Sequence, residues 1–162
     1  MSLRPGVRLG VDWGDARVGV AACDPAGTLA YPVSTLHVRG DDDAAITALL
    51  GLVEEYGPVL EVVMGLPKTL KGKEGPAAQK MRRRSRALRG RLDPAVGLRL
   101  VDERMTTVTA SRGLQAAGRN TREQRAVIDQ AAAVAILDHA LTVESTTGQA
   151  AGELVEPTQT GV

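Results

Sequence analysis

The sequence predicts an α/β fold in which a mixed five-stranded sheet carries helices on both faces. Three apolar segments of strand length come first and are joined by short links, an order typical of an antiparallel meander. Apolar residues then recur at helical spacing and alternate with further short apolar runs, the pattern of β-α-β units with parallel strands. Binding sites are expected beyond the carboxyl ends of the central strands of such a sheet.

The strands of the meander are expected at residues 7–13, 18–23 and 29–38. A Gly-Asp-Ala-Arg link separates the first two, and the Asp-Pro-Ala-Gly sequence at 24–27 is a turn before the third. Three aspartates at 41–43 then suit the N-terminus of a helix, which Gly57-Pro58 ends. The remaining elements are expected as a strand at 60–64, a helix at 76–92, a strand at 98–102, and helices at 107–117 and 124–143.

The length of 162 residues leaves room for one hydrophobic core. We expect one domain over residues 1–144 and a disordered tail over 145–162, where Ser, Thr, Gly, Gln and Pro replace the periodic pattern. No apolar run approaches the roughly 18 residues that cross a bilayer, and the start of the chain has no signal-peptide segment. These features predict a cytoplasmic protein that does not bind membranes.

Cys23 is the single cysteine and stands directly before the turn at 24–27. A lone cysteine commonly packs as a small buried apolar side chain. A thiol at this turn could instead lie near the surface and link two chains into a homodimer under oxidising conditions. The sequence leaves both interpretations open.

Acidic residues stand where predicted apolar segments give way to polar ones. Asp12 lies near the end of the first strand, and Asp102 and Glu103 end another. Asp129 lies in a stretch that is apolar almost all round, where an ionised carboxylate is costly unless it is paired or holds a cation. The acids could converge to hold Mg²⁺ or Mn²⁺, because these ions prefer oxygen ligands. Alternatively, the strand-end acids are turn residues and Asp129 pairs with an arginine such as Arg17 or Arg104.

Two further patterns bear on binding. Gly10, Gly14 and Gly19 flank Asp12 and indicate either close approach of a ligand or a tight hairpin. Between Lys68 and Arg91, ten basic residues face a single acid, although the whole chain has a net charge of only +1. This segment includes the predicted helix at 76–92, and its local charge favours a polyanionic partner such as nucleic acid. The residues expected on the outer face of that helix are Lys80, Arg82, Arg83, Arg86 and Arg89.

Four sequence blocks resemble the YqgF/RuvX family of pre-16S rRNA nucleases and Holliday junction resolvases. They are D-W-G-D-A-R-V-G-V-A at 12–21, M-G-L-P at 64–67, D-E-R-M-T-T at 102–107 and D-Q-A-A-A-V-A-I-L at 129–137. The blocks follow the family's order, and the second has Met where the family has Val. The resemblance implies a ribonuclease H-like fold.

The resemblance also implies a metal-binding catalytic set of Asp12, Glu103 and Asp129, with Asp102 as the alternative to its neighbour. These residues would hold Mg²⁺ or Mn²⁺ for a two-metal-ion reaction. The side chains expected to bind nucleic acid are Arg17, Lys68, Lys71, Lys73, Lys80, Arg82, Arg83, Arg86 and Arg104.

The function implied by the resemblance is a metal-dependent nuclease that processes the 5′ end of pre-16S rRNA in ribosome biogenesis. Cleavage of Holliday junctions or other branched DNA is the alternative with the same chemistry. A non-catalytic RNA-binding factor in ribosome assembly is a further alternative. The Asp-x-Gly motif at 12–14 also resembles the phosphate motif of actin-like ATPases, but those proteins close two such domains around a nucleotide and this chain has room for one.

Overall fold

The computed structural model describes residues 3–105 and 122–157. The helix expected at 107–117 lies outside the described residues. The elements in chain order are β1 (Val7–Trp13), β2 (Arg17–Cys23), β3 (Ala30–His37), α1 (Asp42–Glu55), β4 (Val59–Leu66), α2 (Pro76–Arg91), β5 (Gly97–Asp102), the short 3-10 helix η1 (Glu103–Met105), α4 (Arg122–Thr147) and β6 (Glu153–Leu154).

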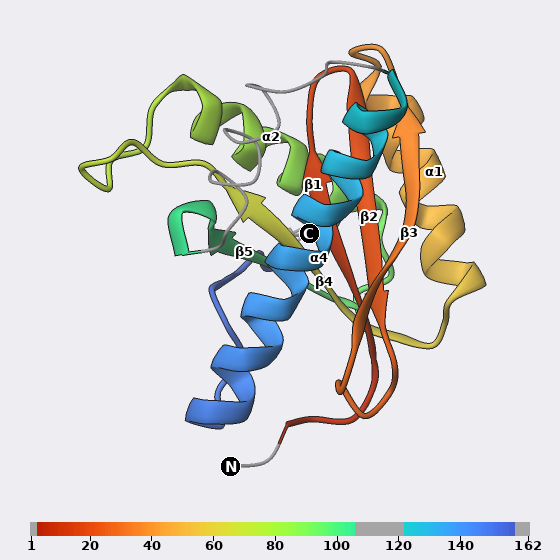
Figure 1. Cartoon of the computed structure of the whole chain (residues 1–162), viewed down its shortest axis with the longest axis vertical. Coiled ribbons are helices and arrows are strands. Elements are labelled where there is room, and N and C mark those ends of the chain that lie inside the picture. Colours follow the sequence, from red (N-terminus) through yellow and green to blue (C-terminus); the bar gives the residue numbers. More distant parts are fainter. Residues whose placement is uncertain (1–2, 106–121, 158–162) are drawn as a thin grey trace, which may run out of the picture.

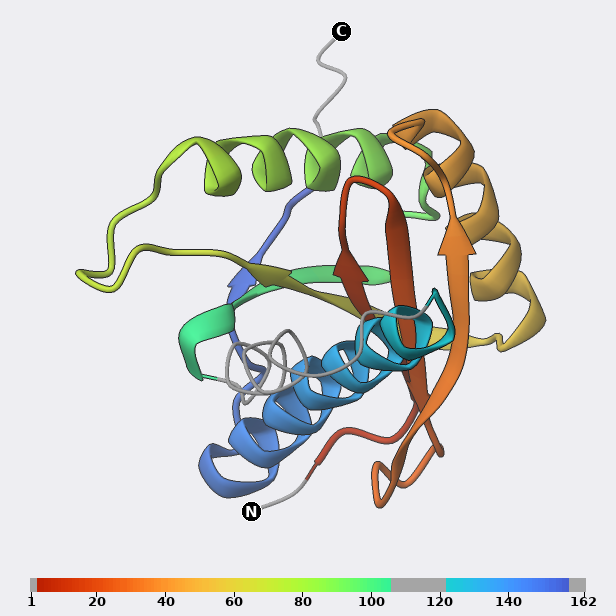
Figure 2. The same ribbon diagram turned by 45° about the horizontal axis from the view of Figure 1, so that its top comes forward.

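The strands form one mixed sheet in the order β3-β2-β1-β4-β5-β6. Strands β1 to β3 form the antiparallel meander, and β1, β4 and β5 are parallel, as the sequence predicts. Helices α1 and α2 cover one face of the sheet and α4 crosses the other (Figures 1 and 2). The predicted α/β class with helices on both faces is therefore confirmed.

The sheet has six strands, not five, because the chain after α4 returns to the edge of β5. Helix α4 continues past residue 144 to Thr147, and Glu153–Leu154 pair antiparallel with β5. The amide of Val155 adds a 2.8 Å hydrogen bond to the carbonyl of Leu98. The predicted disordered tail from residue 145 is thus wrong up to residue 157. The composition of this segment does not reveal the strand, because the unpaired backbone groups of an open sheet edge can pair with a segment of almost any sequence.

Side chains alternate between the two faces of β1 and so build two separate layers of core. Leu9, Val11 and Trp13 belong to the larger apolar cluster, which α1 and α2 cover. Gly10 and Asp12 alternate with these residues and therefore face the other side of the sheet, where α4 lies. Asp12 is therefore a polar residue at the end of an otherwise buried strand.

Two glycines let α4 lie unusually close to the sheet. A Cβ at Gly19 would stand 2.0 Å from the carbonyl oxygen of Asp129, and one at Gly10 would stand 2.6 Å from that of Ala133. Any side chain at either position would push the helix outward. These glycines therefore admit a helix of the same chain rather than a ligand.

Cys23 is fully buried on the α4 side of β2. Its Sγ accepts a 3.3 Å hydrogen bond from the backbone amide of Arg8, and burial raises the pKa of the thiol. Cys23 is still part of β2, so its side chain faces α4 and does not lie in the turn. A homodimer linked through a surface Cys23 is therefore wrong, and the buried interpretation holds.

Arg89 was expected on the outer face of α2, but its side chain is buried. It donates hydrogen bonds of 2.8 Å to the carbonyl of Val96 and 2.7 Å to that of Asp93. Backbone carbonyls near a helix C-terminus need donors, and the arginine supplies them within the chain. Arg89 is therefore a structural residue.

Candidate active site

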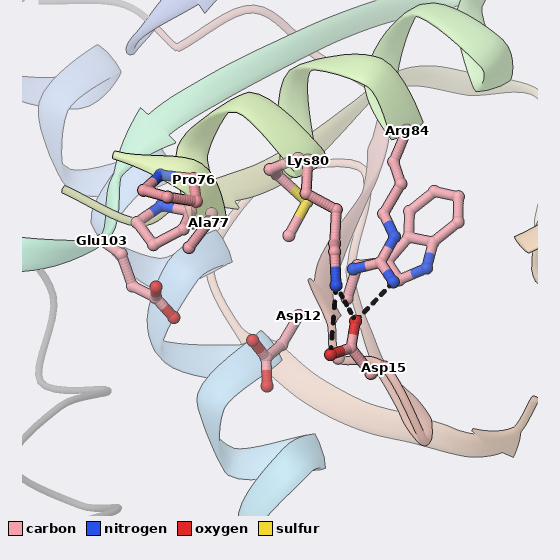
Figure 3. A pocket seen from close by; sticks show the side chains of 12 residues that line it. Asp12, Asp15, Pro76, Ala77, Lys80, Arg84 and Glu103 are labelled. Atoms are coloured by element: carbon pink, nitrogen blue, oxygen red, sulfur yellow. Dashed lines mark hydrogen bonds and ion pairs between the residues drawn. The ribbon is translucent and has the colours of Figure 1, made fainter. Parts of the chain in front are cut away.

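A cleft of about 400 Å³ lies where β1 and β4 end beneath the first turns of α2. Figure 3 shows the side chains of Asp12 and Glu103 entering it from different elements. Asp12 is only 6% exposed. The position agrees with the expectation that sites form at the carboxyl ends of the central strands.

The sheet register explains why these two acids meet. Val11 pairs with Met64 across the parallel strands β1 and β4, so Asp12 stands beside Gly65. Gly65 pairs in turn with Val101 of β5, and Glu103 follows that strand. A Cβ at Gly65 would lie 3.8 Å from the carboxyl carbon of Glu103 and 2.8 Å from Ile136 of α4. Glycine here leaves space for the acid and the helix alike.

Asp15 is a cleft residue that the sequence reasoning did not single out. Its carboxylate accepts hydrogen bonds of 2.7 Å from Arg84 and 3.1 Å from Lys80 (Figure 3). These contacts, that of Arg84 above all, lower the pKa of Asp15. Arg84 also binds Asp42 at 3.1 Å, and its guanidinium carbon stands 5.6 Å from the centre of the Trp13 ring.

These contacts fix the β1–β2 turn to α2 and shape one wall of the cleft. One signal could have revealed them. Lys80 and Arg84 are four residues apart, so they share a face of the helix and reach the same acid.

Asp129, the third predicted acid, does not line the cleft. Its carboxylate accepts a 2.6 Å hydrogen bond from Nε of Arg17, in an ion pair whose two side chains are both partly exposed. Among the residues that the structure describes, no three His, Cys, Asp or Glu side chains are grouped to hold a metal ion. The structure thus unites two of the three predicted acids and gives Asp129 the arginine partner that the sequence offered as the alternative.

Asp102 and Glu103 have different environments although they are adjacent. Arg104 donates a 2.6 Å hydrogen bond to the Asp102 carboxylate, and this contact lowers the pKa of Asp102. Asp102 is absent from the lining of the cleft, whereas Glu103 is part of it. Of the two alternatives, the geometry favours Glu103 as the site residue.

The predicted nucleic-acid-binding residues fall into two groups. Arg17, Lys80, Arg82 and Arg104 are engaged in ion pairs, and Arg82 bridges Glu74 of the loop and Glu153 of β6. The others make no ion pair with any residue that the structure describes; they are Lys68, Lys71, Lys73, Arg83 and Arg86. The local positive charge available to a ligand is therefore smaller than the sequence count, and it is centred on the second group.

A second charged cluster, which the sequence reasoning missed, lies at the opposite end of β1. Glu144 of α4 binds Arg4 at 2.7 Å and Arg8 at 3.0 Å, and Glu61 of β4 binds Arg99 at 3.1 Å. Burial alone would raise the pKa of Glu144, but the hydrogen bonds from Arg4 and the charge of Arg8 lower it to about 2. Every carboxylate here has a cationic partner, which is the pattern of a structural network.

The donor set of the cleft fits a divalent cation of the magnesium type. Mg²⁺ is commonly held by one or two carboxylates, with substrate phosphate oxygens and water completing its octahedron. Asp12 and Glu103 provide two carboxylates in a cleft that also carries the cationic side chain of Lys80. A closed cage of protein ligands is not required for such an ion.

The chain matches known proteins over almost its whole length. The family model described as RuvX, Holliday junction resolvase, matches residues 6–143. A protein of Streptomyces avermitilis is 57% identical over 156 residues, which cover 96% of this chain and 98% of that one. A protein of a Nocardioides species is 54% identical over 157 residues, covering 96% and 100%. Both relatives carry the name "Putative pre-16S rRNA nuclease".

A solved structure shares the fold. RuvC of Thermus thermophilus, in complex with a Holliday junction substrate, superposes with a TM-score of 0.56 at 12% identity and covers 93% of this chain and 99% of that one. At this identity the likeness is one of fold alone. It confirms the ribonuclease H-like architecture expected from the sequence. No helix in the described part of the chain is long and apolar enough to span a membrane.

Proposed function

The chain belongs to the RuvX family, and from this membership we propose that it is a nuclease that hydrolyses phosphodiester bonds of structured nucleic acid in the cleft at the ends of β1 and β4. The observation that carries the proposal is the meeting in one cleft of Asp12 from β1 and Glu103 from η1, directly after β5. Two converging carboxylates beside a cationic helix can bind a cation and a phosphate together.

Asp12 and Glu103 would hold the divalent ion, Mg²⁺ or Mn²⁺, together with oxygens of the substrate phosphate. Such an ion would lower the pKa of the water bound to it and would neutralise the charge that develops on the phosphate. Lys80, in the wall of the cleft, would orient the phosphate. The burial of Asp12 strengthens its electrostatic interaction with bound cations because little water screens it.

The two-ion form of the reaction needs more ligands than these two acids provide. Asp129 is the further acid that the sequence supplies, and its carboxylate is held by Arg17. Asp129 would become a metal ligand only if Arg17 released its carboxylate and bound a substrate phosphate instead. The variant Asp129→Asn tests this step.

We propose structured RNA as the substrate, in particular the 5′ end of pre-16S rRNA in the cytoplasm, because the curated relatives at 57% and 54% identity carry that name. The description of the family as Holliday junction resolvases supports branched DNA as the second candidate. Both substrates offer phosphodiester bonds, so the same cleft would serve either.

Cleavage of labelled pre-16S rRNA and of a four-way DNA junction, each titrated with Mn²⁺, tests the proposal. We expect metal-dependent cleavage of the RNA that Asp12→Asn abolishes while the circular dichroism spectrum stays that of the parent. Asp138→Asn, on the exposed face of α4, is the matched control and should cleave normally. Cleavage by Asp12→Asn at the parent rate contradicts the proposed site. Binding without cleavage by the parent at any metal concentration would support the non-catalytic RNA-binding alternative.

A further inference from the structure

The loop between β4 and α2, residues 67–75, presents an exposed leucine at its tip. Leu70 is 97% exposed, more than any other large apolar side chain that the structure describes. Figures 1 and 2 show the loop reaching away from the sheet in both views. A single exposed apolar residue needs no explanation by itself, so its surroundings decide what it does.

The backbone that carries Leu70 is a compact, hydrogen-bonded turn. The amide of Thr69 donates to the carbonyl of Lys73 at 2.8 Å, and the amide of Lys73 donates to the Thr69 hydroxyl at 3.1 Å. Gly72, with φ of +81°, closes the turn through a 2.8 Å bond to the carbonyl of Thr69. The leucine is therefore held outward before any partner arrives, which lowers the entropic cost of its insertion into a ligand.

The turn is also tied to the candidate active site. Arg104 donates a 3.4 Å hydrogen bond to the carbonyl of Leu70, and Asp102 holds the same guanidinium group. Glu103, between these two residues, lines the cleft, and so does Pro67 at the start of the loop. The position of Leu70 is thus fixed relative to the proposed site of cleavage.

The charge around the tip indicates what it meets. Lys68, Lys71 and Lys73 surround Leu70 in sequence, and none forms an ion pair with a residue that the structure describes. Lysines suit the phosphates of a nucleic acid, and an apolar side chain between them suits the faces of its bases. Leucine is among the residues that proteins insert between base steps, which partly unstacks them.

We propose that Leu70 is a wedge that unstacks the bases at the boundary between duplex and single strand, while Lys71 and Lys73 hold the flanking phosphates. The proposal rests on the proposed function, since it needs nucleic acid at the cleft. Leu70 is a positioning residue: it would present a distorted phosphodiester to Asp12 and Glu103 without touching the reacting atoms.

The test uses hairpins with a single-stranded extension, made as RNA and as DNA, with 2-aminopurine in the last base pair. The fluorescence of this base rises when it unstacks. Measurements are made with the full chain in EDTA, so that cleavage is not needed. We expect the parent to raise the fluorescence on binding. Leu70→Ala should lose most of this rise while its Kd changes by less than about threefold, because the phosphate contacts remain.

Matched variants separate the wedge from its lysines. Leu29→Ala alters another exposed leucine, 64% exposed before β3, and should behave as the parent. Lys71→Ala with Lys73→Ala should weaken binding and lower the salt slope of log K by about one to two units. An undiminished fluorescence rise in Leu70→Ala, or no rise with the parent, overturns the wedge even if the protein cleaves. A wedge signal in a protein that never cleaves overturns the nuclease proposal and leaves the wedge standing.

Discussion

Asp102 and Glu103 are neighbours in sequence with different environments, and variants at the two positions should therefore differ. Glu103→Gln removes a proposed metal ligand and should lower single-turnover cleavage by at least about a hundredfold. Asp102→Asn weakens the hold on Arg104, so we expect a smaller loss of about tenfold, with the fold intact. A larger loss of cleavage in Asp102→Asn than in Glu103→Gln would indicate that Asp102, and not Glu103, is the metal ligand.

The ion pair of Asp129 predicts the stability of its variant. If Asp129 stood among converging acids, its neutralisation would relieve repulsion and raise metal-free stability. Because it pairs with Arg17 at 2.6 Å, Asp129→Asn should instead lower the free energy of unfolding by about 1 kcal/mol, since both side chains are partly exposed. Urea denaturation in EDTA measures this change.

Cleavage by the same variant reports separately on the two-ion proposal. A rate near that of the parent would exclude Asp129 as a metal ligand, whereas a stable but inactive variant would support that role. Asp138→Asn on the same helix controls for the loss of a negative charge.

At the residue scale the sequence predicted positions better than partners. Asp12 and the Asp102–Glu103 pair could be singled out because strands that end in acids put them at one edge of the sheet, whereas the choice of Glu103 within the pair came from the family resemblance. The partner of Asp129 could only be named as one of two arginines, because that choice depends on how α4 crosses β2. Gly19 determines this crossing, and its role becomes visible only when the helix is in place.

At the scale of elements, the outer face of α2 divides into paired and unpaired arginines. Arg83 and Arg86 make no ion pair with a described residue, while Arg82 is held by Glu74 and Glu153. Changing Arg83 and Arg86 together to Ala should lower the salt slope of RNA binding by about two units and weaken all sequences alike.

Arg82→Ala is the matched comparison on the same helix. It should change the salt slope less, since its charge is already compensated within the protein. An equal slope change in Arg82→Ala and in a single Arg83→Ala variant would show that the ion pairs of Arg82 open on binding. Fluorescence anisotropy over a range of KCl concentrations gives the slopes.

The helix was predictable from its spacing, but the use of its arginines was not. Arg89 was expected in solvent and is buried, while Arg84 reaches Asp15 and Asp42, which are far from it in sequence. A count of charges along one segment does not reveal such ion pairs, because the acidic partners come from other elements. The count of basic residues between Lys68 and Arg91 therefore overstates the charge that a nucleic acid would meet.

At the scale of the whole molecule, the order of the strands and helices that the structure describes from β1 to β5, followed by α4, and the placement of helices on both faces of the sheet followed from the apolar pattern. The sixth strand and the buried network of Arg8, Glu61 and Glu144 did not. Both depend on contacts between segments that are far apart in the sequence, which periodicity does not encode. Helix α4 links this network to the candidate site, because it carries Asp129 toward one end of the sheet and Glu144 toward the other.

The network predicts how the stability of the molecule depends on pH. The pKa of Glu144 is lowered from 4.5 to about 2 in the folded protein, so ionised Glu144 contributes stability above pH 4.5 that is lost as the pH falls toward 2. The contribution is on the order of 3 kcal/mol. Glu144→Gln should therefore be strongly destabilised at pH 7, because buried Arg8 loses its charged partner.

The difference in unfolding free energy between the parent and Glu144→Gln should shrink as the pH is lowered from 5 toward 3, because protonation removes from the parent what the substitution removes from the variant. Urea denaturation followed by circular dichroism at each pH measures it. Glu55→Gln, near the exposed end of α1, controls for the loss of an acid that the network does not use. A difference that stays constant over this range would mean that folding does not lower the pKa of Glu144, and that its contacts with Arg4 and Arg8 do not favour its ionised form.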